Sequence, residues 1–137
     1  MNFTELTEDN YVLFAIKYYD NPSAVTKEDF LDDLRRFKYI KRLINKYHNS
    51  NEGAMTQIAL APCSPFSVSE KVMHESSKLS KKHSVLLHTH LAETEDENSF
   101  CLEKMGCRPL EYLEQVGWLT NRTWLAHGIH FTDKEIQ

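Results

Sequence analysis

The chain has 137 residues, of which 41% are hydrophobic and 26% charged, which suits a globular protein of one ordinary domain or two small ones. It has no apolar run long enough to cross a membrane, and its polar, acidic first ten residues lack the features of a secretory signal, so we expect a cytoplasmic protein. The net charge of -4 makes a nucleic-acid-binding role for the whole chain unfavourable, and three widely spaced cysteines indicate free thiols rather than a disulfide framework.

Two differently patterned regions meet near residue 50. Residues 48–53 (HNSNEG) are of the types found in turns and linkers. Counted along the sequence, residues 1–50 carry eight basic and eight acidic side chains, whereas residues 51–137 carry eight and twelve. The second region therefore holds the negative excess, and we predict two domains, residues 1–50 and 51–137.

The first region predicts a helical hairpin. Thr7 can cap a helix that ends before Pro22, and Thr26 can cap a second helix whose apolar residues recur at helical spacing as far as Tyr47. A hairpin of this size buries a thin core, so we expect it to need a partner or the second region.

Basic residues concentrate on the second predicted helix. They could form a nucleic-acid-binding patch, but aspartates at helical spacing make a solvated face the simpler interpretation. The basic residues are Arg35, Arg36, Lys38, Lys41, Arg42 and Lys46.

The second region alternates strand-like and helical patterns. Predicted strands cover residues 57–61, 84–90 and 123–129, and an acidic loop is expected at residues 93–98. Ser67 or Ser69 can cap a helix that runs to about residue 82, further helices are predicted over residues 99–105 and 109–116, and another opens at Thr132. This alternation predicts an α/β fold with parallel strands joined by right-handed crossovers.

Polar side chains gather where the predicted strands end, as expected for a site in a parallel α/β fold. His88 and His90 lie two residues apart, so they project from the same face of a strand. Glu93 follows this strand, and His127 lies near the end of the next. Imidazoles are common zinc ligands and a neighbouring carboxylate can move protons, although histidine pairs in strands are often structural.

The same residues stand in motifs of a known family. Residues 61–68 (APCSPFSV), 88–94 (HTHLAET) and 124–130 (WLAHGIH) resemble the motifs at strands four, five and six of the amidohydrolase superfamily, aminohydrolase branch. The resemblance covers residues 56–137, and the nearest members are 8-oxoguanine deaminases and triazine hydrolases. It implies a partial (β/α) barrel of about three parallel strands, preceded here by the helical hairpin.

The resemblance also implies a role for each polar residue. His90 would ligate a single metal, zinc or iron, and Glu93 and His127 would be catalytic. Glu93 would move protons between a metal-bound water and a ring nitrogen, while His127 would orient the water. His88 would line the pocket for a small heterocyclic substrate, which would be hydrolytically deaminated.

Part of the family's site is absent from this sequence. The family uses a further H-x-H pair in its first strand and an aspartate in its eighth, and neither is found. Catalytic zinc sites use three protein ligands as a rule. We therefore expect the chain alone to bind zinc weakly and to be inactive, with open sheet edges that could mediate self-association.

The first region has a separate resemblance. Residues 3–48 are similar to the start of an uncharacterised family of small marine-phage proteins, which brings no activity. An alternative is thus a helical module that binds a partner or nucleic acid and carries a non-catalytic β/α passenger. Another is a self-contained zinc site made by His88, His90 and His127 with Cys63 or His130.

Overall fold

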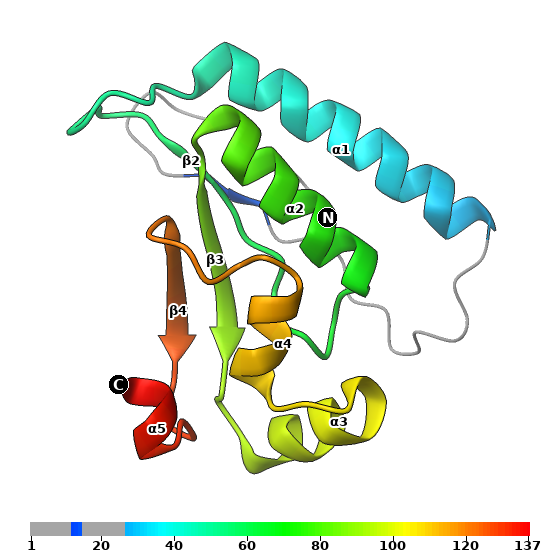
Figure 1. Cartoon of the computed structure of the whole chain (residues 1–137). Helices are drawn as coiled ribbons and strands as arrows, with labels where there is room; N and C mark the ends of the chain where they lie inside the picture. The colour runs from blue at the N-terminus through cyan, green and yellow to red at the C-terminus, as the bar shows by residue number, and fades with distance from the viewer. Residues whose placement is uncertain (1–11, 15–26) are drawn as a thin grey trace.

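The computed structural model describes residues 12–14 and 27–137, in which strands alternate with helices along the chain (Figure 1). The strands are β1 (Val12–Phe14), β2 (Ile58–Leu60), β3 (Leu86–Leu91) and β4 (Thr123–His127). The helices are α1 (Lys27–Tyr47), α2 (Glu70–His83), α3 (Glu95–Met105), α4 (Pro109–Gln115) and α5 (Asp133–Ile136). No helix in this described part is long and apolar enough to span a membrane.

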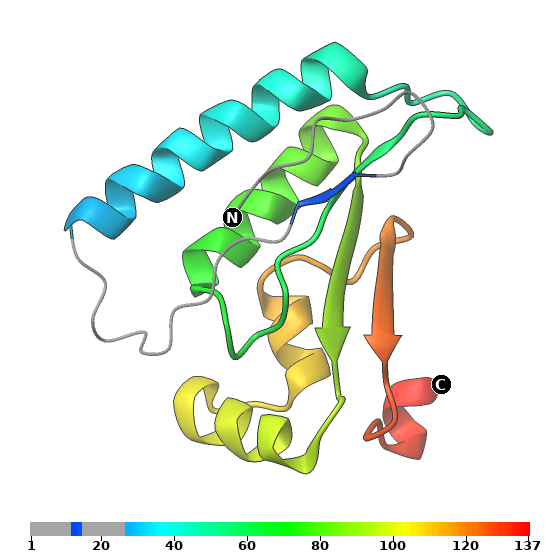
Figure 2. The same ribbon diagram turned by 180° about the vertical axis from the view of Figure 1, so that it is seen from behind.

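The strands form one parallel sheet in the order β1-β2-β3-β4. The β3–β4 pair is the longest, running in register from Leu87 opposite Thr123 to Leu91 opposite His127. Helices α1 and α2 lie on the same side of the sheet, as the two opposite views agree (Figure 2). The predicted parallel α/β arrangement with three strands in the second region is therefore confirmed.

A fourth strand occupies part of the predicted hairpin. Residues 12–14 were expected to be helical but form β1, which pairs with Ile58–Leu60 of β2. A short apolar run can suit either state, and pairing with a neighbouring strand outweighs local pattern. The remainder of the first predicted helix lies outside the described residues, and the second predicted helix is confirmed as α1.

Helix α3 begins earlier than the sequence indicated. The expected acidic loop at residues 93–98 becomes helical from Glu95, because the side chain of Thr94 caps the helix by accepting the amide of Glu97. Three acidic residues in this first turn are favourable beside the positive end of the helix dipole.

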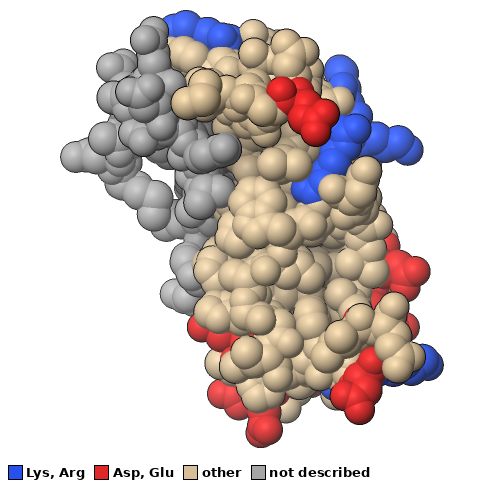
Figure 3. Space-filling model, turned by 90° about the vertical axis from the view of Figure 1, so that its left-hand side faces the viewer, with Lys and Arg blue, Asp and Glu red and all other residues tan. Residues whose placement is uncertain are grey.

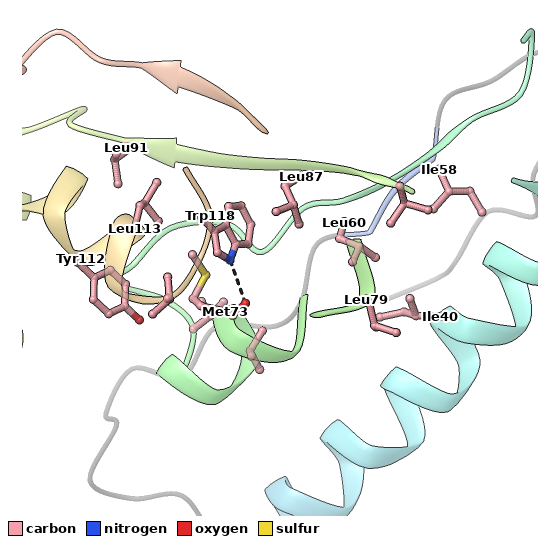
Figure 4. Packing of buried hydrophobic residues seen from close by; sticks show 14 of the residues in the cluster. Ile40, Ile58, Leu60, Met73, Leu79, Leu87, Leu91, Tyr112, Leu113 and Trp118 are labelled. Carbon is pink, nitrogen blue, oxygen red and sulfur yellow. Dashed lines mark hydrogen bonds between the residues drawn. The ribbon is translucent and has the colours of Figure 1, made fainter. Parts of the chain in front are cut away.

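The core joins α1 to the second region. Figure 4 shows Ile40 of α1 reaching toward Leu79 of α2, and both belong to a single buried cluster. At its other end the indole of Trp118 donates to the carbonyl of Met73 at 2.9 Å. The fully buried members include Ile58, Leu60, Met73, Leu87, Leu91, Tyr112, Leu113 and Trp118. The hairpin's second helix is thus covered by the β/α layer, while the division into two domains remains a prediction.

A histidine fastens the connection between α1 and β2. The backbone amide of Ile58 donates to Nδ1 of His48 at 3.0 Å. A ring nitrogen that accepts must be unprotonated, so this bond requires neutral His48. Burial lowers the pKa of His48 below its ordinary value, which is consistent with a neutral ring in the folded state.

We predict that this contact makes stability depend on pH. The pKa of His48 is lower in the folded than in the unfolded chain, so the stabilisation is complete above about pH 6.5 and is lost as the pH falls from there through the folded pKa. His48→Asn keeps an acceptor that does not titrate. The unfolding free energy of this variant, measured in urea between pH 5 and 7.5, should therefore vary less with pH than that of the parent chain.

His48→Leu provides the matched control, because it leaves the amide of Ile58 without its acceptor. We expect it to lose about 1–3 kcal/mol at pH 7.5. An asparagine variant whose pH profile runs parallel to that of the parent would contradict the assignment.

Candidate functional site

Strand β3 separates core residues from polar ones. Leu87, Thr89 and Leu91 are buried, whereas His88 and His90 alternate with them and are partly exposed on the opposite face. This alternation follows from the two-residue period of a strand. The face that the helices leave uncovered therefore carries both imidazoles.

Backbone carbonyls fix the orientation of both rings. Nδ1 of His90 lies 2.9 Å from the carbonyl oxygen of Cys63, and Nδ1 of His88 lies 3.2 Å from that of Trp124. A carbonyl only accepts, so each Nδ1 carries the proton and each Nε2 keeps its lone pair in the neutral ring. This is the tautomer in which a histidine can ligate a metal through Nε2.

The carbonyl of Cys63 is the common anchor in the loop after β2. Besides the ring of His90, it accepts the backbone amide of His90 at 2.9 Å and the hydroxyl of Thr89 at 3.1 Å. Three donors on one backbone oxygen fix the end of β3 relative to this loop.

His127 reaches the site through an unusual backbone conformation. It pairs with Leu91, whose side chain is buried, so plain strand alternation would place His127 on the core side. Its φ of +71° ends the strand, and its ring lies 5.3 Å from that of His90 between centroids. A left-handed backbone at a residue with a Cβ costs about 1–2 kcal/mol.

Glu93 completes the predicted set. Its Oε1 lies 3.5 Å from Nε2 of His127, with both side chains partly exposed. The structure therefore brings together His88, His90, Glu93 and His127, the four residues that the sequence singled out. Cys63 contributes its backbone to this region, and the amide of His130 donates to the carbonyl of Ala92 at 3.1 Å.

Two further residues of the site were missed. The indole of Trp124 stacks on His88, with ring centroids 4.7 Å apart and an interplanar angle of 19°. The strand pairing places Trp124 directly opposite His88, a contact that cannot be predicted from the sequence without knowing the register of the two strands. The second is Glu97, which is 1% exposed and whose Oε2 accepts the amide of Glu93 at 3.0 Å.

Burial raises the pKa of Glu97, while the hydrogen bond from the backbone amide of Glu93 opposes the shift. Burial also lowers the pKa of His88, which is consistent with its neutral, Nδ1-protonated form. One sign of the position of Glu97 is present in the sequence: it stands three residues after Thr94, and this T-x-x-E spacing is typical of the start of a helix.

The loop after β4 is fixed from outside the site. The guanidinium of Arg108 donates to both carboxylate oxygens of Glu135, at 2.9 and 3.0 Å, and to the carbonyl of His130 at 3.1 Å. These bonds hold the pKa of Glu135 down at about 2. The start of α4 is thereby tied to the segment that follows His127.

The histidines do not complete a metal site by themselves. Within residues 12–14 and 27–137, no group of three or more His, Cys, Asp or Glu side chains is arranged to hold a metal ion. His90 has the tautomer of a ligand, but catalytic zinc needs about three protein ligands. The alternative of a self-contained zinc site gains no support from the described residues.

The middle of the side on which β4 lies is largely uncharged (Figure 3), and acidic and basic side chains lie toward its top, bottom and right-hand margin in this view. Large apolar side chains are exposed on β4 and the segments flanking it: Leu119 by 46%, Trp124 by 42% and Ile129 by 71%. Large apolar side chains are therefore exposed around β4, whose outer edge is unpaired within the described residues.

Known proteins resemble this chain in two ways. A family model described as "Family of unknown function (DUF7207)" matches residues 1–60. An 8-oxoguanine deaminase of Pseudomonas aeruginosa is 58% identical over 97 residues, which are 71% of this chain and 22% of that protein. A 5'-deoxyadenosine deaminase of Methanosphaera stadtmanae is 37% identical over 112 residues, covering 80% of this chain and 26% of the relative.

A solved structure shares the fold. The atrazine chlorohydrolase TrzN of Arthrobacter aurescens, complexed with zinc, matches with a TM-score of 0.67 and 29% identity over 72% of this chain and 22% of that one. This chain therefore spans roughly a quarter of the length of the relatives that it matches. The aligned 97 residues exceed the 82 of residues 56–137, so the deaminase similarity extends further toward the N-terminus than the motifs indicated.

We predict that His127 is held in place at the expense of stability. His127→Gly relieves the left-handed backbone and should raise the unfolding free energy, measured in urea, by about 1 kcal/mol. Ala126→Gly is the control, because Ala126 has ordinary strand backbone and glycine there should lower stability by about 0.5–1 kcal/mol. Equal losses of unfolding free energy in the two variants would refute backbone strain at His127.

Proposed function

We propose that this chain, which carries a segment of an amidohydrolase-superfamily aminohydrolase, supplies one part of a metal-dependent active site that deaminates purine- or triazine-like rings. The observation that carries the proposal is the meeting of His90, Glu93 and His127 at the carboxyl ends of the neighbouring strands β3 and β4. Ligands and reacting groups collect at these ends in parallel α/β folds.

Each side chain has a task that suits its surroundings. Glu93 is partly exposed and beside His127, so its carboxylate can take a proton from an attacking water and pass it to a ring nitrogen. His127 can hydrogen-bond that water, and His88 stacked on Trp124 offers a flat wall to a planar ring. These assignments extend to this chain what the resemblance implies for the family.

The described residues provide only part of the ligand set of a metal site. His90 presents a free Nε2, and a zinc ion bound in such a site lowers the pKa of its water. Because a single ligand falls short of the usual three, we propose that the chain is inactive as a deaminase until further ligands are supplied.

The isolated chain should therefore bind zinc only weakly. Equilibrium dialysis of the purified chain should give well under one tightly bound zinc per chain. His90→Ala should weaken the remaining binding, and His74→Ala, on the partly exposed surface of α2, should leave it unchanged. One tightly bound zinc that survives His90→Ala would contradict the assignment of His90.

The segment should work when the rest of the barrel is present. In a chimera, the matched segment of the Pseudomonas aeruginosa 8-oxoguanine deaminase is replaced by the corresponding residues of this chain. We expect the chimera to release ammonia from 8-oxoguanine, and Glu93→Gln to lower kcat by about 100-fold or more, because proton transfer is lost.

Glu111→Gln is the matched control, since Glu111 is an exposed acidic residue of α4. It should leave kcat unchanged. A correctly folded, zinc-loaded chimera without ammonia release would overturn the proposed function, as would one whose activity is indifferent to Glu93→Gln.

Three finer points belong to the same proposal. We place the chain in the cytoplasm, we retain residues 1–50 and 51–137 as its domains, and we expect self-association through open edges of the sheet, such as that of β4. The alternative of a nucleic-acid-binding helical module is not favoured, because deaminase similarity covers most of the chain. Two basic residues of α1 also lie against tyrosine rings, Arg42 on Tyr39 and Lys46 on Tyr47.

A further inference from the structure

Two T-x-x-E segments start helices in this chain, and they behave differently. At α5, Thr132 and Glu135 form a complete capping box, in which each side chain binds the other's backbone amide. At α3, the hydroxyl of Thr94 accepts the amide of Glu97 at 3.4 Å, which is one half of such a box. The returning carboxylate of Glu97 binds one residue further back, at the amide of Glu93.

The contact between the Glu97 carboxylate and the Glu93 amide has an energetic cost. Glu97 is 1% exposed, its Oε1 is buried without a hydrogen-bonding partner in the described structure, and burial raises its pKa. Glu135 can be compared directly, because it has the same helix position but a guanidinium partner and a pKa of about 2. A buried carboxyl with one unsatisfied oxygen is unfavourable for stability alone.

The contact between Glu97 and the Glu93 amide lies directly after a residue with left-handed backbone. Ala92, directly before Glu93, has a φ of +53°, and its carbonyl accepts the amide of His130. The chain thus leaves β3 through a left-handed residue and must turn into α3 within a few residues. Glu97 fixes the amide of Glu93 at the point where the Glu93 side chain begins, and the carboxylate of Glu93 then lies 3.5 Å from His127.

We propose that Glu97 is a positioning residue, which through its bond to the Glu93 amide directs the Glu93 carboxylate toward His127. This inference rests on the proposed function for its catalytic consequence. Its structural content, a restrained Glu93 backbone, can be measured in the isolated chain without activity.

The first experiment measures hydrogen exchange of the Glu93 amide by NMR in the isolated chain. Glu97→Leu removes the acceptor and should speed this exchange by about 10-fold or more, because the amide loses its bond. Glu97→Gln retains an acceptor oxygen and should stay near the parent rate. Ser80→Ala is the matched control, since it deletes a buried hydrogen bond, away from the site, from Ser80 on α2 to the carbonyl of Val85 just before β3.

The second experiment uses the deaminase chimera. Glu97→Leu should lower kcat by about 10-fold or more with KM within about 2-fold, and Glu97→Gln should restore most of the rate. A merely structural role predicts instead that Glu97→Leu behaves like Ser80→Ala, with lower stability and an unchanged kcat.

The outcomes separate the two proposals. A chimera that is inactive with all parent residues overturns the proposed function, and the amide exchange then decides the inference alone. Unchanged Glu93 exchange in Glu97→Leu overturns the inference, as does an unchanged kcat in an active chimera. If Glu97→Leu fails to fold, the test uses Glu97→Gln instead. The NMR signal of the Glu93 amide proton should then lie upfield of its position in the parent chain. An unchanged chemical shift would overturn the inference.

Discussion

The parallel pairing of β3 with β4 is the constraint on which the site depends. Five residue pairs in register bring the two strand ends to the same edge, so that Glu93 and His127 meet although 34 positions separate them in the sequence. The pairing needs the helices behind it, because Leu87 and Leu91 of β3 are buried in the same cluster as α2 and α4. Core packing on one face therefore sets the geometry of polar side chains on the other.

Much of this arrangement could be predicted from the sequence. The period-two pattern of β3 and the order of the strands suffice to place His88 and His90 on one face and His127 nearby. Residues 12–14 were assigned to a helix because their strand partner lies 46 residues away in β2, and a local pattern holds no information on a distant partner. Glu97 was missed for a related reason, since an acidic run is usually solvated and burial depends on the final packing.

The two similarities of the chain meet in one core. A family of unknown function matches residues 1–60, while the deaminase similarity extends back beyond Thr56. In the structure, Ile40, Leu43 and Ile44 of α1 are buried together with Ile58 and Leu60 of β2. Whatever the origin of the first region, its second helix provides the apolar cover that one face of the sheet requires.

The anchor of His90 is a main-chain oxygen, that of Cys63, and this affects how the site can change over generations. A side-chain anchor is removed by a single codon change, whereas a carbonyl is present whichever amino acid occupies the position. The orientation of His90 is thus shielded from point substitutions at residue 63. It can be altered by changes that move the backbone, such as an insertion in the loop after β2.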